Sequence, residues 1–196
     1  VVMSNCLLTT LPDNVIQNAS SNFFHFKAHN NQITYVSPLA FNGTRLEILD
    51  LLENPIVGFP DLTLHSETLK SVLFSGANIP TFTFENYTNL QSVKIFTCQV
   101  QEIPPEAFRN TKVNYIEIKD NLLSDFPNLL DIKDYLVHIS MGFNYIVKDI
   151  PADYFKDFQH LRDVNFQKSR IYGINQTAFS GQRDPGVELY LLLDAN

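Results

Sequence analysis

Residues 46–60 read LEILDLLENPIVGFP, and this stretch decides the fold. Its first, fourth, sixth and eleventh residues are apolar, its ninth is Asn54, and an apolar residue followed by Pro60 ends it. An apolar-x-apolar core with a period of two is typical of a strand that buries alternate side chains. The stretch therefore predicts a short strand, a turn at Asn54 and a return segment that begins near Phe59.

The same pattern recurs along the chain at intervals of 21 to 25 residues. The seven complete copies begin at apolar residues: Phe23, Leu46, Leu69, Leu90, Val113, Leu136 and Leu161. Partial copies occupy 1–22 and 188–196. A period of this length indicates a repeat architecture, in which each unit buries its apolar face by stacking on its neighbours. We therefore expect one continuous array over 1–196 rather than a compact domain.

The pattern resembles the leucine-rich repeat, in the longer form LxxLxLxxNxLxxLPxxxFxx that is common in extracellular proteins. The resemblance covers essentially the whole chain. It implies an α/β solenoid, a right-handed coil with a parallel β-sheet on its concave side and an irregular convex side. Its ends are unusual for the extracellular type, because Cys-rich caps are lacking. We therefore expect either a fragment of a longer array or ends that something else covers.

The Asn position of the repeat predicts a buried ladder. An Asn amide both donates and accepts hydrogen bonds, so it can satisfy backbone groups that a turn leaves unpaired. The predicted ladder consists of Asn31, Asn54, Asn121, Asn144 and Asn196. Cys6 and Cys98 take the same position four coils apart, a separation of about 19 Å at about 4.8 Å per coil. A disulfide needs Cα atoms within about 7 Å, so we expect no disulfide and two buried thiols.

A large side chain recurs in the return half of the repeat. The aromatic residues at this position are Phe41, Tyr87, Phe108, Phe155 and Phe179, and Leu64 takes it in the second complete copy. One such side chain per coil would fill the return side of the core. We therefore expect a buried stack there rather than a ligand site.

Charge and motifs exclude several classes of function. The formal net charge is −7 and no Lys/Arg cluster occurs, which disfavours binding to nucleic acid or an anionic membrane. No apolar run approaches the roughly 18 residues of a membrane span, so this segment should not insert into a bilayer. His25 and His29 would lie roughly 13 Å apart on a strand, too far to share a zinc ion. Since nucleophile, phosphate-loop and Cys-x-x-Cys motifs are also absent, we expect no enzyme, no metal and no cofactor.

Four Asn-x-Ser/Thr sequons begin in the return halves, at Asn18, Asn42, Asn86 and Asn175. A glycan on a return segment could point to solvent without blocking the sheet. The sequons therefore favour a secreted or extracellular glycoprotein, or the ectodomain of a membrane-anchored one.

The open face of the sheet is the predicted site of function. Apolar, aromatic and charged residues gather there on neighbouring coils: Ile48, Asp50, Leu52, Leu73, Lys94, Phe96, Tyr115 and Glu117. Clustered apolar residues on a surface mark interaction sites, and aromatics among charges are typical of protein interfaces. We therefore expect an extracellular module that binds a protein partner. Two alternatives stay open: an oligomeric assembly subunit of a glycoprotein complex, and a carrier whose Leu73, Phe96 and Tyr115 contact a small apolar ligand.

Overall fold

The computed structural model of this protein describes residues 1–16, 23–181 and 188–193. Within them, strands and 3-10 helices follow one another along the chain. In chain order they are β1 (Thr10–Leu11), β2 (Phe23–Lys27), β3 (Tyr35–Val36), β4 (Arg45–Leu51), η1 (Thr63–His65), β5 (Ser71–Ser75), β6 (Ser92–Phe96), β7 (Tyr115–Glu117), η2 (Leu130–Ile132), β8 (His138–Ser140), β9 (Asp163–Asn165) and β10 (Tyr190–Leu192).

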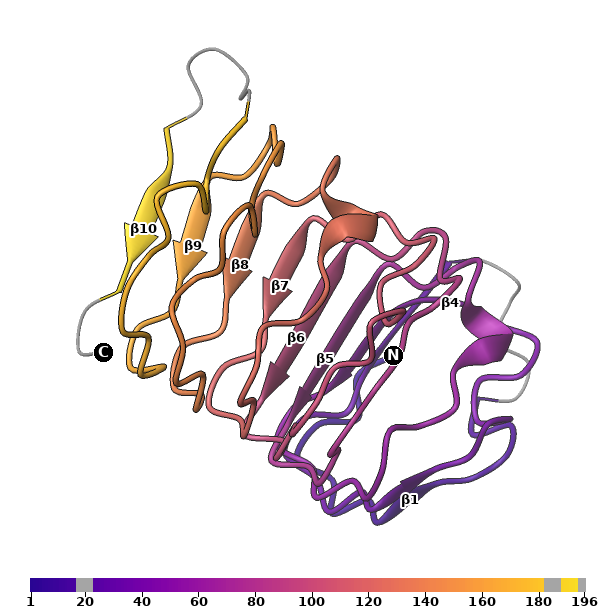
Figure 1. The fold of residues 1–196 in the computed structure, drawn as a ribbon. Helices are drawn as coiled ribbons and strands as arrows, with labels where there is room; N and C mark the ends of the chain where they lie inside the picture. The colour runs from indigo at the N-terminus through magenta and orange to yellow at the C-terminus, as the bar shows by residue number, and fades with distance from the viewer. Residues whose placement is uncertain (17–22, 182–187, 194–196) are drawn as a thin grey trace.

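Eight strands form one parallel sheet, in the order β2, β4, β5, β6, β7, β8, β9, β10. Figure 1 shows these strands side by side along the array, with the return segments forming a second layer. The short strands β1 and β3 pair separately and are also parallel. Each strand of the main sheet pairs with the strand of the next coil, which is the architecture that the repeat predicted.

The predicted inward positions line the space between the sheet and the return segments. The leading residues of six copies are completely buried: Leu46, Leu69, Leu90, Val113, Leu136 and Leu161. The remaining copy differs, because Leu46 pairs with Phe24 rather than Phe23. The register shifts just after this pair, where β4 contributes Glu47 as an extra residue. The leading inward residue of that copy is therefore Phe24, one position later than predicted.

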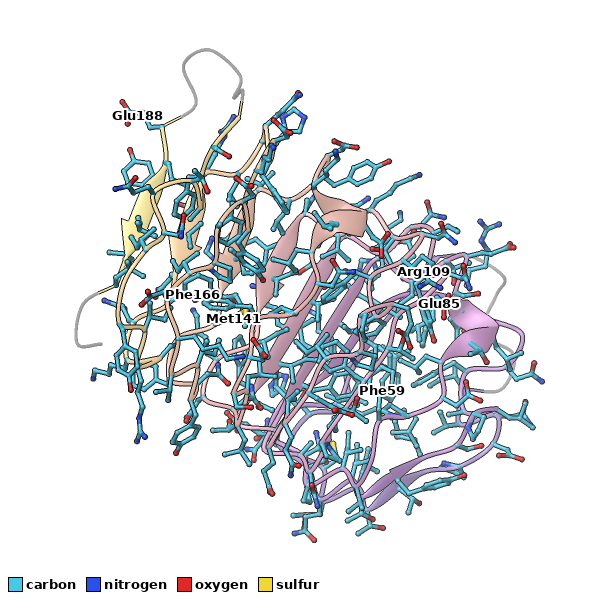
Figure 2. The ribbon with its side chains drawn as sticks, viewed as in Figure 1. Phe59, Glu85, Arg109, Met141, Phe166 and Glu188 are labelled. Atoms are coloured by element: carbon cyan, nitrogen blue, oxygen red, sulfur yellow. The ribbon has the colours of Figure 1, made fainter. Side chains whose placement is uncertain are left out.

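The α/β description is not confirmed. In the part of the chain that the structure describes, the helical segments are η1 and η2, each a three-residue 3-10 helix, and turns or irregular chain make up the rest of the return side. Prolines such as Pro60 and Pro127 lack the N–H that a helix interior needs. Side chains join neighbouring return segments instead, as in the 3.0 Å ion pair between Glu85 and Arg109 (Figure 2).

The Asn positions form a column of buried amides at the turns. Its described members are Asn31, Asn54, Asn121 and Asn144. Asn121 accepts the backbone N–H groups of Cys98 at 3.0 Å and Val100 at 3.1 Å, and donates to the Ile95 carbonyl at 3.0 Å. The other three bond the preceding coil in the same way. Each amide thus joins two coils, while the predicted member Asn196 lies outside the described residues.

The aromatic positions form a second buried column, on the return side. Phe41, Tyr87, Phe108 and Phe155 are buried and Phe179 is half-buried. The expectation for Leu64 was wrong: it is 58% exposed, and His65 turns inward with only 3% exposed. The η1 helix points these neighbours in different directions, and the His65 ring centroid lies 6.2 Å from that of Phe41.

The two cysteines lie in different environments, and both are free. Cys98 is buried, its thiol donates to the Phe96 carbonyl at 3.1 Å, and burial raises its pKa to about 11. Cys6 is exposed, so the prediction of a second buried thiol was wrong. It precedes β2, the last strand at that end of the described sheet. Nowhere in residues 1–16, 23–181 and 188–193 is there a helix long and apolar enough to cross a membrane.

Candidate functional site

The strand register gathers side chains into two rows on the open face of the sheet. Row A consists of His25, Ile48, Ser71, Ser92, Tyr115, His138, Asp163 and Tyr190. Row B consists of Lys27, Asp50, Leu73, Lys94, Glu117, Ser140, Asn165 and Leu192. Adjacent members of a row belong to neighbouring strands, about 4.8 Å apart. Residues one repeat apart in the sequence are therefore direct neighbours on this face.

The predicted partner-binding residues fall mainly in these rows. Six of the eight are members: Ile48, Asp50, Leu73, Lys94, Tyr115 and Glu117. Phe96 pairs with Ser75 at the ends of their strands, and Leu52 follows β4 directly. Seven are half-buried rather than fully exposed. Asp50 is buried, and its carboxylate accepts the Leu52 N–H at 3.3 Å.

Row A has an aromatic centre at Tyr115 and His138. Their rings are stacked, with centroids 4.3 Å apart and an interplanar angle of 10°. The Nδ1 atom of His138 lies 3.6 Å from the Asp163 carboxylate, and Lys94 Nζ lies 4.6 Å from the Tyr115 ring centroid. A cation over an aromatic face is attracted by the ring. The predicted set omitted His138 and Asp163, although both take the position in their copies that Tyr115 takes in its own.

Glu117 joins this centre to the charged groups of row B. Its carboxylate lies 2.6 Å from Lys119 Nζ and 3.4 Å from Lys94 Nζ. Burial raises the pKa of Glu117, but the two ammonium groups outweigh burial and hold it below its ordinary value. Burial, and then the charge of Glu117, raises the pKa of Tyr115. At neutral pH the region therefore offers a carboxylate, two ammonium groups and a neutral phenol.

The open face does not assemble a nucleophile or a metal centre. Ser140 Oγ is buried without a hydrogen-bond partner in the described chain, so His138 does not activate it as a nucleophile. No three His, Cys, Asp or Glu side chains of the described residues gather to hold a metal ion. His25 lies 3.4 Å from the Glu47 carboxylate, and His29 contacts Ser4 at 3.0 Å. Contacts of this kind are ordinary for polar side chains on a protein surface.

Three of the four predicted glycosylation positions lie on described return segments. Asn42, Asn86 and Asn175 are exposed, and Asn18 lies outside the described residues. The side-chain oxygen of Asn175 accepts the N–H of Thr177 at 3.1 Å and its hydroxyl at 3.2 Å. All three asparagines lie outside the strands and can be reached from solvent.

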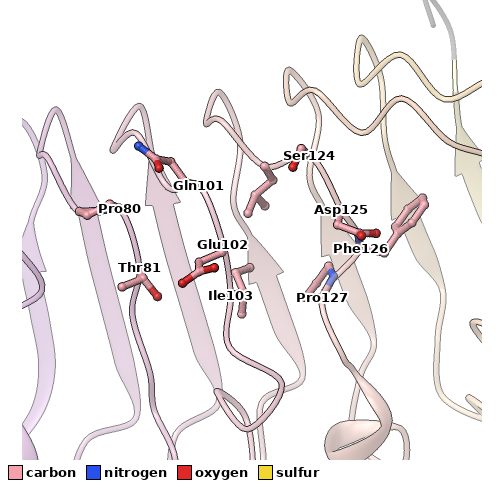
Figure 3. A pocket seen from close by; sticks show the side chains of 10 residues that line it. Pro80, Thr81, Gln101, Glu102, Ile103, Ser124, Asp125, Phe126 and Pro127 are labelled. Atoms are coloured by element: carbon pink, nitrogen blue, oxygen red, sulfur yellow. The ribbon is translucent and has the colours of Figure 1, made fainter.

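A hollow of about 470 Å³ lies between the return segments of three coils (Figure 3). Its lining includes Pro80, Glu102, Ile103, Asp125, Phe126 and Pro127. The Asp125 carboxylate contacts Lys148 and accepts the Phe126 N–H at 2.8 Å, and these bonds outweigh burial to lower its pKa. Leu73, Phe96 and Tyr115, which were the predicted contacts of an apolar ligand, do not line this hollow.

Comparison with known families agrees with the geometry. Residues 9–128 and 59–184 match the family described as BspA type leucine rich repeat region, in six copies. Together these overlapping matches cover most of the chain. No curated protein matches it. The family is generally a non-enzymatic repeat scaffold whose repeats mediate protein interactions.

Proposed function

Because the chain belongs to the BspA-type leucine-rich-repeat family, we propose that it is a recognition module that binds a protein partner through rows A and B. The observation that supports this proposal most is the Tyr115–His138 stack with Lys94, Glu117 and Asp163 around it. Aromatic residues bordered by polar groups are typical of the centre of a protein interface.

The site is also held in place before any partner arrives. Stacking on His138 orients Tyr115, and the ion pairs of Glu117 orient Lys94 and Lys119. Side chains that are already ordered lose less conformational entropy on binding. The charges of both signs favour a partner with mixed charge over a uniformly basic or acidic one.

We further propose that the protein acts outside the cell, as a secreted protein or as the ectodomain of an anchored one. Proteins with BspA-type repeats are typically surface or extracellular proteins of bacteria. The exposed Asn42, Asn86 and Asn175 are compatible with glycans that leave the open face free. If these positions carry N-linked glycans, the native protein should lose mass on treatment with an N-glycosidase, and an unchanged mass would count against glycans there.

The binding proposal is tested with matched variants used as bait in the extracellular fluid of the natural source. A partner retained by the wild type should be lost from Tyr115→Ser and from Glu117→Lys. Leu130→Ser is the control, because Leu130 is an exposed apolar residue of η2 on the return side. Circular dichroism checks that all variants fold. A partner that Tyr115→Ser and Glu117→Lys both retain would contradict the assignment to the open face.

A further inference from the structure

A second cluster of side chains lies outside rows A and B, on the turns that follow β7, β8 and β9. We call it the edge cluster, and its members are Asp120, Leu122, Phe143, Tyr145, Lys168 and Arg170. Leu122, Phe143 and Tyr145 are 41%, 48% and 44% exposed. The predicted apolar residues of the open face are less exposed than these three, because all of them are half-buried. Apolar groups that gather in the open on neighbouring coils mark an interaction surface.

The two cations of the edge cluster lie on its aromatic rings. Lys168 Nζ is 4.8 Å from the Phe143 ring centroid, and the guanidinium carbon of Arg170 is 4.8 Å from that of Tyr145. Neither cation forms an ion pair within residues 1–16, 23–181 and 188–193. On the open face, in contrast, Lys94 is paired with a carboxylate. The hollow that contains both cations includes one carboxylate, Asp120, so it keeps an excess of positive charge on a chain whose net charge is −7.

The backbone at Phe143 is left-handed, as it is at the same position of the other copies. Its φ is 59°, in the left-handed region that bulky residues rarely adopt. The residue that precedes the Asn position is left-handed in all seven complete copies, namely Asn30, Glu53, Gly76, Thr97, Asp120, Phe143 and Lys168. A phenyl group that stays 48% exposed recovers little through burial. The exposed ring of Phe143 is therefore available for a contact outside the chain.

Two shallow hollows flank the Phe143–Tyr145 pair. The hollow on the β6 side has a volume of about 160 Å³, and Thr97, Gln99 and Leu122 line it together with the aromatic pair. The hollow on the β9 side has a volume of about 170 Å³ and contains Lys168, Arg170 and Asp120. The aromatic pair is thus a ridge between a weakly polar hollow and a basic one.

We propose that the edge cluster binds an acidic segment of a partner protein, with a carboxylate at Lys168 and Arg170 and a neighbouring apolar side chain in the hollow beside Leu122. A planar guanidinium recognises a carboxylate through two parallel hydrogen bonds. Asp120 borders both hollows, so it repels a second carboxylate and limits the cluster to one. This surface is separate from rows A and B, so the two could be occupied together.

The test selects ligands without assuming a sequence. Random linear peptides displayed on phage are selected on the immobilised chain, and the recovered peptides are synthesised with a fluorescent label. We expect Asp or Glu beside Leu, Ile, Val or an aromatic residue in the selected sequences. Fluorescence anisotropy should show binding at least about tenfold weaker for Arg170→Glu and for Phe143→Asn, and weaker binding at high salt.

Two controls separate loss of binding from loss of fold and from the open-face proposal. Phe143→Asn should unfold at the same temperature as the wild type or a higher one, because Asn tolerates the left-handed backbone. Tyr115→Ser should bind the peptide as tightly as the wild type. Selected peptides without acidic residues, or unchanged binding to Phe143→Asn, would overturn the proposal. So would binding that Tyr115→Ser abolishes, or self-association of the chain that Phe143→Asn removes.

Discussion

Two columns of buried side chains run along this array. Polar side chains form hydrogen bonds with the backbone in one column, and a polar ring lacks them in the other. In the Asn column, the amide of Asn121 finds backbone donors and an acceptor in the preceding coil. In the aromatic column, the ring of His65 is buried between coils, and neither of its nitrogens has a hydrogen-bond partner in the described chain. The cost of burying a polar group is therefore decided by the backbone around it rather than by burial alone.

The difference comes from the two sides of the coil. At the Asn column the chain leaves a strand and turns, so backbone N–H and C=O groups of two coils point towards the same Asn side chain. On the return side the neighbours of His65 are side chains such as Phe41, which offer no hydrogen bond in the ring plane. The five predictions below test this contrast, from the largest expected effect to the smallest.

Removing an amide from the Asn column should have the largest effect. Asn121→Leu leaves the buried N–H groups of Cys98 and Val100 without an acceptor, so we expect a loss of about 3 kcal/mol or more in the free energy of unfolding. Urea titration measures it. Asn78→Ala is the control, because Asn78 is exposed, and it should change stability by less than about 0.5 kcal/mol. Equal midpoints for the two variants would refute the structural role of the column.

Restoring an aromatic residue to the second column should stabilise the protein. His65→Phe removes two unsatisfied nitrogens from the interior, and we expect a gain of about 1 kcal/mol in the free energy of unfolding at neutral pH. A thermal melt measures it. A destabilised variant would show that the pocket around residue 65 cannot take the larger ring.

The same variant should change how stability depends on pH. Burial lowers the pKa of His65 from its ordinary value of 6.5, so the unfolded chain binds the proton more tightly than the folded one. Wild-type stability should therefore fall as the pH drops below about 6.5, and His65→Phe should reduce that fall. Leu130→Ser, at an exposed residue that does not titrate, should leave the dependence unchanged. An identical pH profile for wild type and His65→Phe would exclude His65 as its source.

Removing the charge of Glu117 from the open face should change the free energy of unfolding less than the substitutions in the two columns. Glu117→Gln weakens two ion pairs on the open face, and we expect a loss below about 1 kcal/mol at neutral pH. Because the pKa of Glu117 is lowered, its contribution is present above pH 4.5 and disappears as the pH falls through the folded value. The free energies of unfolding of wild type and variant should therefore converge in acid. A difference that persists there would show that the charge of Glu117 is not its cause.

The smallest effect concerns accessibility rather than stability. Cys98 lies in the Asn column with a pKa near 11, whereas Cys6 is exposed. A thiol reagent at mild alkaline pH should therefore label Cys6 first and Cys98 only after unfolding, since the thiolate is the reactive form. Mass spectrometry of the labelled chain measures both. Rapid labelling of Cys98 in the folded protein would show that the column is open to water.

Sequence spacing predicted the strands but not the details of the irregular half. Leucines that recur at 46, 69, 90 and 136 must point the same way because the coils stack, and all four are buried. In the return half the spacing pointed to Leu64, but the one-turn helix η1 turns the neighbouring His65 inward instead. The bulge at Glu47 could not be predicted either, because it depends on the register in which β2 and β4 pair. The edge cluster was not predicted, since its residues occupy turn positions without a common type.

By itself the sequence determined the inward strand residues of six complete copies, where each coil turns and which residues stand one repeat apart, because all three follow from a fixed period. Only the tertiary structure decided which side chains meet. Parallel pairing places Tyr115 against His138, although 22 residues separate them in the chain. The twist of the turns places Arg170 on Tyr145 in the same way. Contacts of this kind depend on side-chain orientation across coils, for which a linear pattern carries no signal.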